Sequence, residues 1–195
     1  MNASDIASLV RDARSCRRFI EADPIPAELL LQLVDIARLA PSSRNQQALR
    51  FLVLSSPADR ERIFPFFKWA AALDWAGPQP GERATGYILF LRRVGAQTAH
   101  DAGIAAMTIK LAAAAAGYAS CIMGGIDRPG LHRVLGLSPE TEIDIAVALG
   151  RAGEKIVIEP LAPGAPVAYW HDADDVHHVP KLGLADLLHH TGPSR

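Results

Sequence analysis

Residues 101–117 form a run of alanine and other mostly apolar residues that leaves little polar surface on any side. A helix of this composition is predicted to be buried nearly all round. Either it lies in the centre of the domain's own core, or a partner subunit covers one of its sides. The run favours neither alternative over the other.

Shorter helices and strands are predicted around this run. Apolar side chains at helical spacing predict helices over 4–13 and 26–40, and a third begins at Pro57. Asp127 is the expected N-cap of a short helix over 129–135. Short apolar runs that are rich in strand-favouring residues predict four strands, over 49–54, 87–91, 120–126 and 143–149. This order of elements predicts an α+β or α/β sheet covered by helices.

Length, hydrophobic content and net charge limit the number of domains and the kinds of partner that the chain can have. With 195 residues, 49% of them hydrophobic, the chain can bury one core, so we expect a single domain over 1–195. Residues 151–195 are the expected C-terminal extension, which either wraps the domain or contacts a partner subunit. A net charge of -1 gives no general attraction to nucleic acid. Neither a leader nor an apolar run of membrane-spanning length is evident, so we expect a soluble, cytoplasmic protein with no membrane partner.

Residues 12–19, the arginine segment, place three arginines and a serine directly after the first predicted helix. Arg14 and Arg17 are three residues apart, and guanidinium groups suit phosphate oxygens or the electron-rich edge of a flavin. The segment therefore predicts an anion site. Taken alone, it also fits an exposed basic turn.

Residues 41–47, the polar segment, follow the end of the second predicted helix and offer amides and hydroxyls instead of charge. Their donors and acceptors match a ring edge or a ribityl chain; the residues concerned are Ser42, Ser43, Asn45 and Gln47. A capped helix end followed by a loop is the alternative. Together with the arginine segment, this segment suggests a polar, phosphorylated cofactor.

The end of the third predicted strand contributes Ile122, Gly124 and Gly125. Without side chains at the two glycines, backbone amides can approach a flat ring closely. A simple turn explains the same residues. Since GxGxxG and GxxxxGK[ST] fingerprints are both missing, any phosphate must be held in another way.

No side chain is predicted to act as a covalent catalyst. No serine lies in a GxSxG elbow, and Cys121 has no histidine beside it in sequence. Residues 171–178 contain histidines and acids but match neither an EF-hand nor HExxH. We therefore predict no metal site there, and expect a polar turn leading into a β-like stretch over 176–179.

These residues resemble the FMN-dependent nitroreductase family. The family motif RRSxRxF lies over Ala13–Phe19, and PSSxNxQP lies over Pro41–Ala48. Further similarity follows in the same order along nearly the whole chain, over Trp75–Pro78, Asp101–Ala106, Cys121–Asp127 and Tyr169–Lys181.

The resemblance implies an α+β fold with a central, mostly antiparallel sheet flanked by helices, in an intertwined homodimer with two FMN sites at its interface. Arg14, Ser15 and Arg17 would hold FMN from one subunit, and Ser42, Ser43, Asn45 and Gln47 from the other. Ile122, Gly124 and Gly125 would line the ring, and Lys181 would meet the phosphate. NADH or NADPH would reduce the FMN, which would then reduce a small-molecule acceptor such as a nitroaromatic or a quinone.

Three positions depart from the family pattern. Ala13 replaces the first arginine, Ala48 replaces the proline, and Leu182 stands where a basic residue often follows the lysine. Arg18 and Arg151 are the sequence candidates for replacing the two missing phosphate-side cations. The departures leave two alternatives open: a flavin-binding dimer with little or no reductase activity, and a relative of the same fold that remodels flavin or dehalogenates its substrate.

Overall fold

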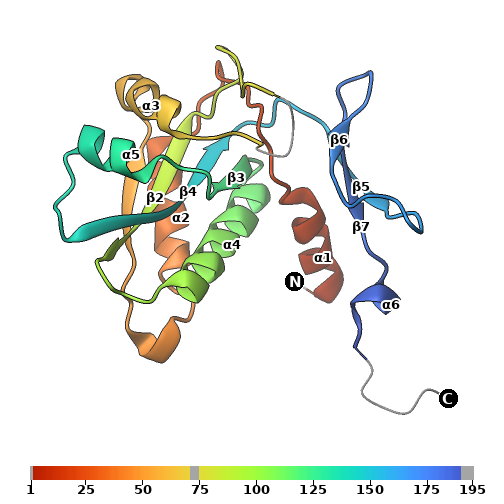
Figure 1. Cartoon of the computed structure of the whole chain (residues 1–195), viewed down its shortest axis with the longest axis horizontal. Helices are drawn as coiled ribbons and strands as arrows, with labels where there is room; N and C mark the ends of the chain where they lie inside the picture. Colours follow the sequence, from red (N-terminus) through yellow and green to blue (C-terminus); the bar gives the residue numbers. More distant parts are fainter. Residues whose placement is uncertain (1, 71–74, 190–195) are drawn as a thin grey trace. The chain divides into compact units, whose positions relative to one another are not determined.

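A computed structural model describes residues 2–70 and 75–189 of the chain (Figure 1). It divides into two compact units, Met1–Gly153 and Glu154–Arg195. The predicted C-terminal extension begins three residues before the second unit. A single domain over the whole chain stays a prediction.

The first unit is built on a four-stranded sheet in the order β1-β2-β4-β3. These strands are β1 (Arg50–Leu54), β2 (Gly86–Arg93), β3 (Ala119–Met123) and β4 (Thr141–Gly150). All three neighbouring pairs are antiparallel, and the β2–β4 register shifts between Leu89 and Leu91. The predicted α+β fold with a mostly antiparallel sheet is confirmed.

Helices cover both faces of this sheet (Figure 1). The helices are α1 (Ala3–Asp12), α2 (Ala27–Ala37), α3 (Pro57–Ile63), α4 (Ala99–Ala115) and α5 (Arg128–Leu135), with short 3-10 turns η1 (Ser43–Asn45) and η2 (Phe64–Phe66). Because side chains alternate along a strand, Ile88 and Phe90 of β2 pack against α2 and α4. Tyr87 faces the other way and stacks on Phe67, with ring centroids 5.2 Å apart.

The alanines of α4 form one side of the main core. Ala102, Ala106 and Ala113 are buried against Leu30 and Leu33 of α2 and against the sheet. Burial all round is not reached within the single chain, since Ile104 on the opposite side of α4 is 40% exposed. The alternative in which this helix is buried nearly all round within the domain's own core is therefore wrong, while the alternative in which a partner subunit covers one of its sides stays a prediction.

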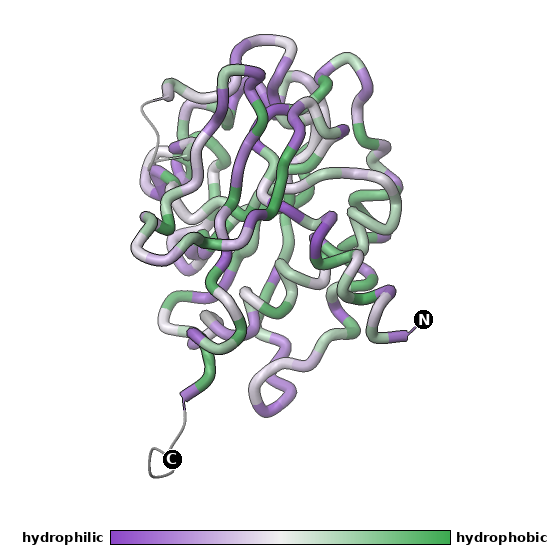
Figure 2. Tube along the Cα trace, turned by 90° about the vertical axis from the view of Figure 1, so that its right-hand side faces the viewer, coloured by the Kyte–Doolittle hydropathy of each residue, from purple (hydrophilic) through white to green (hydrophobic). Residues whose placement is uncertain are grey.

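Helix α1 is well capped but poorly buried. The Asn2 side chain accepts hydrogen bonds from the Ser4 and Asp5 amides, which closes the first turn. None of the residues of α1 is buried, and Ile6 and Val10 are 48% and 39% exposed. Figure 2 shows hydrophilic and hydrophobic residues mixed along this end of the chain.

The second unit has a three-stranded sheet in the order β5-β7-β6. Its elements are β5 (Ile156–Pro160), β6 (Trp170–His171), β7 (His177–Lys181) and the short helix α6 (Leu184–Leu187). Strand β7 pairs parallel to β5 and antiparallel to β6. It lies at the predicted β-like stretch over 176–179, while β5 and β6 were not predicted. Across the described residues of both units, no helix is long and apolar enough to cross a membrane.

Candidate functional site

The arginine segment is anchored to the core at every third residue. Ala13, Cys16 and Phe19 are 5%, 2% and 1% exposed. Between these anchors, Ser15 forms a parallel bridge with Ser120 of β3, and the Cys16 amide donates to the Ser120 carbonyl over 3.1 Å. The segment thus lies along the edge of β3, in a conformation that its own packing fixes.

A buried lysine holds this segment against the strand and the long helix. Lys110 of α4 is 5% exposed, and its ammonium group donates to the Arg14 carbonyl over 3.0 Å. It also donates to the Ser120 carbonyl and hydroxyl, over 3.2 and 3.3 Å. Burial, with the Arg14 and Arg17 charges nearby, lowers the pKa of Lys110 from 10.5 to about 8. Lys110 was not among the predicted site residues, although it is the single charged residue in the apolar run over 102–117.

Arg14 carries a donor that the described residues do not satisfy. Its Nη1 donates to the Val10 carbonyl over 3.1 Å, but its Nε is buried without a hydrogen-bond partner. Arg17 makes a long hydrogen bond, 3.4 Å, from Nη1 to the Ser15 carbonyl. Because an unsatisfied buried donor on a charged group is costly, the Arg14 guanidinium suits an anionic or electron-rich ligand that accepts from Nε.

The end of β3, at Met123, lies three residues beyond the Ser15–Ser120 bridge. Ile122 is 37% exposed, and Gly124 faces open space, since a Cβ there would meet no atom within 4 Å. At Gly125 a Cβ would lie 3.2 Å from the Lys68 carbonyl oxygen. A side chain at residue 125 would therefore crowd the Lys68 backbone, whereas Gly124 leaves the strand end accessible to a flat ligand.

The polar segment is exposed and is held mainly through its backbone. The Ser43 amide donates to Asp101 Oδ1 over 2.9 Å, and the Gln47 amide donates to the Ser42 hydroxyl over 3.2 Å. Asn45 and Gln47 have positive φ angles of 54° and 47°. Asp101, in the first turn of α4, is 5% exposed and was given no role by the sequence analysis.

A cavity of about 340 Å³ adjoins the polar segment. Ser42, Gln47 and Asp101 line its polar side, and residues from the end of α2 and the start of β1 line the rest. Apolar groups make up most of this lining. The cavity is thus open to a ligand or a side chain with one polar edge.

The predicted residues fall into three groups. Arg14, Ser15 and Arg17 lie on the segment that bridges β3 at Ser120, the strand that leads to Ile122, Gly124 and Gly125. Ser42, Ser43, Asn45 and Gln47 form a second group around Asp101. Since Asp101 and Lys110 are nine residues apart on α4, their backbones are separated by about 14 Å along the helix. Lys181 is the exposed last residue of β7, in the second unit.

The two arginines considered as substitutes for missing cations are engaged by protein groups. Arg151 donates to Asp23 over 2.9 Å and to the Gly117 carbonyl over 2.8 Å, and its guanidinium lies over the Tyr118 ring. Arg18 lies 4.0 Å from a Glu82 carboxylate oxygen and 5.3 Å from the Trp75 ring centroid. Binding a phosphate through either one would require these contacts to rearrange.

Comparison with known proteins adds to this geometry. Residues 10–151 match the model of the Nitroreductase family. YdgI of Bacillus subtilis, named as an NAD(P)H nitroreductase, is 24% identical over 207 residues, which cover 87% of this chain and 99% of YdgI. A nitroreductase family protein of Clostridium difficile superposes with a TM-score of 0.68 at 19% identity, over 98% of this chain and 99% of that one. NfnB of Mycobacterium smegmatis, an FMN-dependent nitroreductase solved with NADPH, gives 0.61 at 20% identity, over 78% and 90%.

Proposed function

Because the chain belongs to the nitroreductase family and is by class an NAD(P)H-dependent oxidoreductase, we propose that it binds FMN and uses NADH or NADPH to reduce a small acceptor. A nitroaromatic or a quinone is the expected kind of acceptor. The observation that carries the proposal is the Ser15–Ser120 bridge, which joins the segment carrying the buried, unpartnered Arg14 Nε to the strand that leads to the open Gly124. A flavin offers an electron-rich polar edge to the arginine segment and a flat face to the strand end.

The arginine segment supplies the charge of the proposed site. Arg14 and Arg17 offer guanidinium donors, and Ser15 adds a hydroxyl beside them. A cation near the pyrimidine side of a flavin stabilises negative charge on the reduced ring. Since the segment is anchored in the core, these groups are positioned before any ligand arrives, and less ordering entropy is lost on binding.

The strand end supplies the surface for the ring. Ile122 offers an apolar side chain, and Gly124 and Gly125 offer backbone without side chains. FMN, when bound, would accept the hydride from the nicotinamide and pass it to the acceptor. The protein's own residues would bind and orient the ring, and no side chain is assigned a covalent role.

A homodimer would bring the arginine segment of one subunit close to the polar segment of its partner. Ser42, Ser43, Asn45 and Gln47 would reach the ring from the partner subunit, as the family resemblance implies. Two features support this: α1 has no buried residue, and Ile104 on α4 is 40% exposed. Exposed apolar helix faces of this kind are typical of subunit interfaces. Lys181 stays the proposed contact of the FMN phosphate.

The visible absorption spectrum of the purified protein tests this proposal. We expect a bound flavin spectrum, or its appearance on adding FMN, with one FMN per chain and a dimer in sedimentation. Anaerobic addition of NADH or NADPH should bleach the flavin band, and adding a nitroaromatic or a quinone should restore it. Double-reciprocal plots of the initial rate, with one substrate varied at fixed concentrations of the other, should give parallel lines, as expected for a ping-pong reaction.

Two results would contradict the proposal in different ways. Protein that stays colourless in excess FMN would refute the cofactor. Stoichiometric FMN that neither nicotinamide reduces would identify a flavin-binding dimer without reductase activity. Analysis of the flavin after aerobic turnover separates reductase activity from flavin remodelling, because remodelling would fragment the ring.

A further inference from the structure

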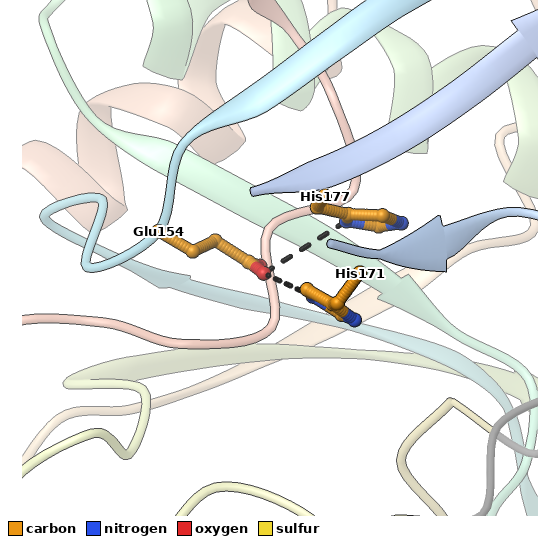
Figure 3. Close-up of side chains that lie close together, drawn as sticks. All are labelled: Glu154, His171 and His177. Carbon is orange, nitrogen blue, oxygen red and sulfur yellow. Dashed lines mark hydrogen bonds and ion pairs between the residues drawn. The ribbon is translucent and has the colours of Figure 1, made fainter. Parts of the chain in front are cut away.

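The second unit gathers one carboxylate and two histidines from distant positions in the sequence. His171 ends β6 and His177 begins β7, and the two are direct partners in the antiparallel register. The His177 amide donates to the Lys155 carbonyl over 2.8 Å, which brings the neighbouring Glu154 alongside. Figure 3 shows the carboxylate of Glu154 directed toward both imidazole rings.

The three side chains are close together and largely shielded from water. Glu154 Oε2 lies 3.5 Å from His171 Nε2 and 3.8 Å from His177 Nδ1. One possible ligand atom from each residue lies within 4.8 Å of the other two. The Glu154 and His177 side chains are 2% exposed, and that of His171 is 21% exposed.

We propose that Glu154, His171 and His177 bind one divalent transition-metal ion of the zinc class. Two imidazole nitrogens and a carboxylate oxygen are a ligand set that such ions prefer, with water as the fourth ligand. Ligands about 2.1 Å from a tetrahedral ion lie about 3.4 Å apart. The two glutamate–histidine distances are near this value, and a rotation of the His171 ring, the most exposed of the three, closes the distance between the imidazoles.

The surroundings favour a cation at this position. A buried carboxylate favours a cation nearby, and a metal ion bound by Glu154 and both imidazoles would balance the carboxylate charge. Residues 154–195 contain six acidic and three basic residues, so the unit also attracts cations electrostatically.

Neighbouring aromatic rings hold the imidazoles in place. The His171 and His177 rings stack with centroids 4.8 Å apart, and the Tyr169 ring packs edge-on against His177 at 5.1 Å. The adjacent His178 is not a fourth ligand, because its two ring nitrogens donate to Glu159 and Asp172. The ion would connect the start of β5 with β6 and β7, so its binding would stabilise the small sheet.

Calorimetric titration of the metal-stripped, untagged full chain with Zn²⁺ tests this site. We expect one Zn²⁺ per chain, proton release on binding at mildly acidic pH, and a higher melting temperature with the metal than without it. His171→Phe keeps the stacked ring but removes a ligand, so it should weaken Zn²⁺ binding at least tenfold. His189→Ala, which removes an exposed histidine of the same unit, is the matched control and should leave the affinity unchanged.

Several outcomes would overturn the metal site. These are an absence of stoichiometric binding, wild-type affinity in folded His171→Phe or Glu154→Gln protein, or a loss of affinity in His189→Ala. X-ray absorption of zinc-loaded wild-type protein decides the matter without a variant. It should show two imidazoles among oxygen or nitrogen ligands, whereas sulfur or water ligands alone would refute the assignment. None of these measurements depends on FMN. A result that refutes the metal site therefore leaves the proposed reductase activity untouched, and the reverse also holds.

Discussion

The arginine segment and the polar segment both carry predicted cofactor contacts, yet the protein holds them in different ways. The arginine segment is packed into the core at Ala13, Cys16 and Phe19 and is hydrogen-bonded to β3. The polar segment lies on the surface, and three of its residues have positive φ angles. One half of the proposed site is therefore fixed by burial, and the other by local backbone geometry.

Helix α4 supports both segments through one charged residue each. Lys110 donates to the carbonyl of Arg14, and Asp101 accepts from the amide of Ser43. Each contact satisfies backbone groups, so each acts by positioning a segment and not by touching the proposed ligand. The difference is that Lys110 is buried among neutral acceptors and nearby arginines, which makes its charge costly.

The largest predicted effect concerns the pH dependence of stability at Lys110. Its pKa is about 8 in the folded protein, against 10.5 as the ordinary value, so the unfolded chain binds more protons between these two pH values. The wild type should therefore gain about 3 kcal/mol relative to Lys110→Met as the pH rises from about 8 to 10.5, with no further change below that window. Urea unfolding of both proteins across the window measures this difference.

Lys68→Met is the matched control, because Lys68 is exposed. Its stability difference from the wild type should stay constant over the same pH range. A constant difference for Lys110→Met as well would show that water reaches the Lys110 ammonium group, and the arginine segment would then be less firmly fixed than its burial indicates.

The second effect tests the ligand side of the arginine segment. Arg14→Met removes the buried Nε donor and its charge, and a charge-assisted hydrogen bond contributes about 1.5–3 kcal/mol. FMN should therefore bind roughly tenfold to a hundredfold more weakly, as measured by fluorescence titration. Arg62→Met, which removes an arginine that pairs with Asp59 on α3, should leave FMN affinity unchanged. Equal affinity in both variants would place the cofactor away from Arg14.

The sequence predicts those features that depend on residues close together in the chain, and not those that depend on contacts between distant residues. Helices α1 to α5 and the four strands of the main sheet were predicted because their apolar periodicity is contained in each segment. The grouping of Arg14 with Gly124 came from motif resemblance and stays a prediction; the structure shows only that the bridge from Ser15 to Ser120 holds the arginine segment along β3. In contrast, Lys110 and Asp101 act on segments 58 or more residues away, and no local pattern reports such contacts.

In the second unit, too, contacts between residues far apart in the chain were not predicted. Strand β6 has only two residues, which is too few to show a period, and β5 pairs in parallel with β7, which follows β6 in the chain. The histidine stretch over 171–178 was noticed, but Glu154 lies 17 residues before His171 and was not connected with it. Only the pairing of β6 with β7, and of Lys155 with His177, brings the three side chains together.

A smaller effect is expected where the polar segment joins α4. Asp101→Ala removes the acceptor of the Ser43 amide and an acidic group from the first turn of the helix, which together should cost about 1–2 kcal/mol of stability. Asp101→Asn keeps an oxygen acceptor and should recover part of this loss. Hydrogen exchange at the Ser43 amide should become faster in Asp101→Ala, while the Cys16 amide in the arginine segment should stay protected. If both amides exchange faster, the two segments are coupled through α4 and are not independently held.

The smallest effect separates backbone strain from side-chain contacts in the polar segment. Arg44 is exposed and has a φ of 51°, a left-handed conformation that costs a non-glycine residue about 1 kcal/mol or more. Arg44→Gly removes this cost but gives the unfolded chain more freedom, so a net stabilisation of about 0.5 kcal/mol is expected in thermal unfolding. Gly136→Ala is the reverse substitution, at a φ of 62° after α5, and should destabilise the protein by about 1 kcal/mol. If Gly136→Ala destabilises as expected but Arg44→Gly does so too, the Arg44 side chain itself holds the segment, and local backbone geometry is not what distinguishes it from the arginine segment.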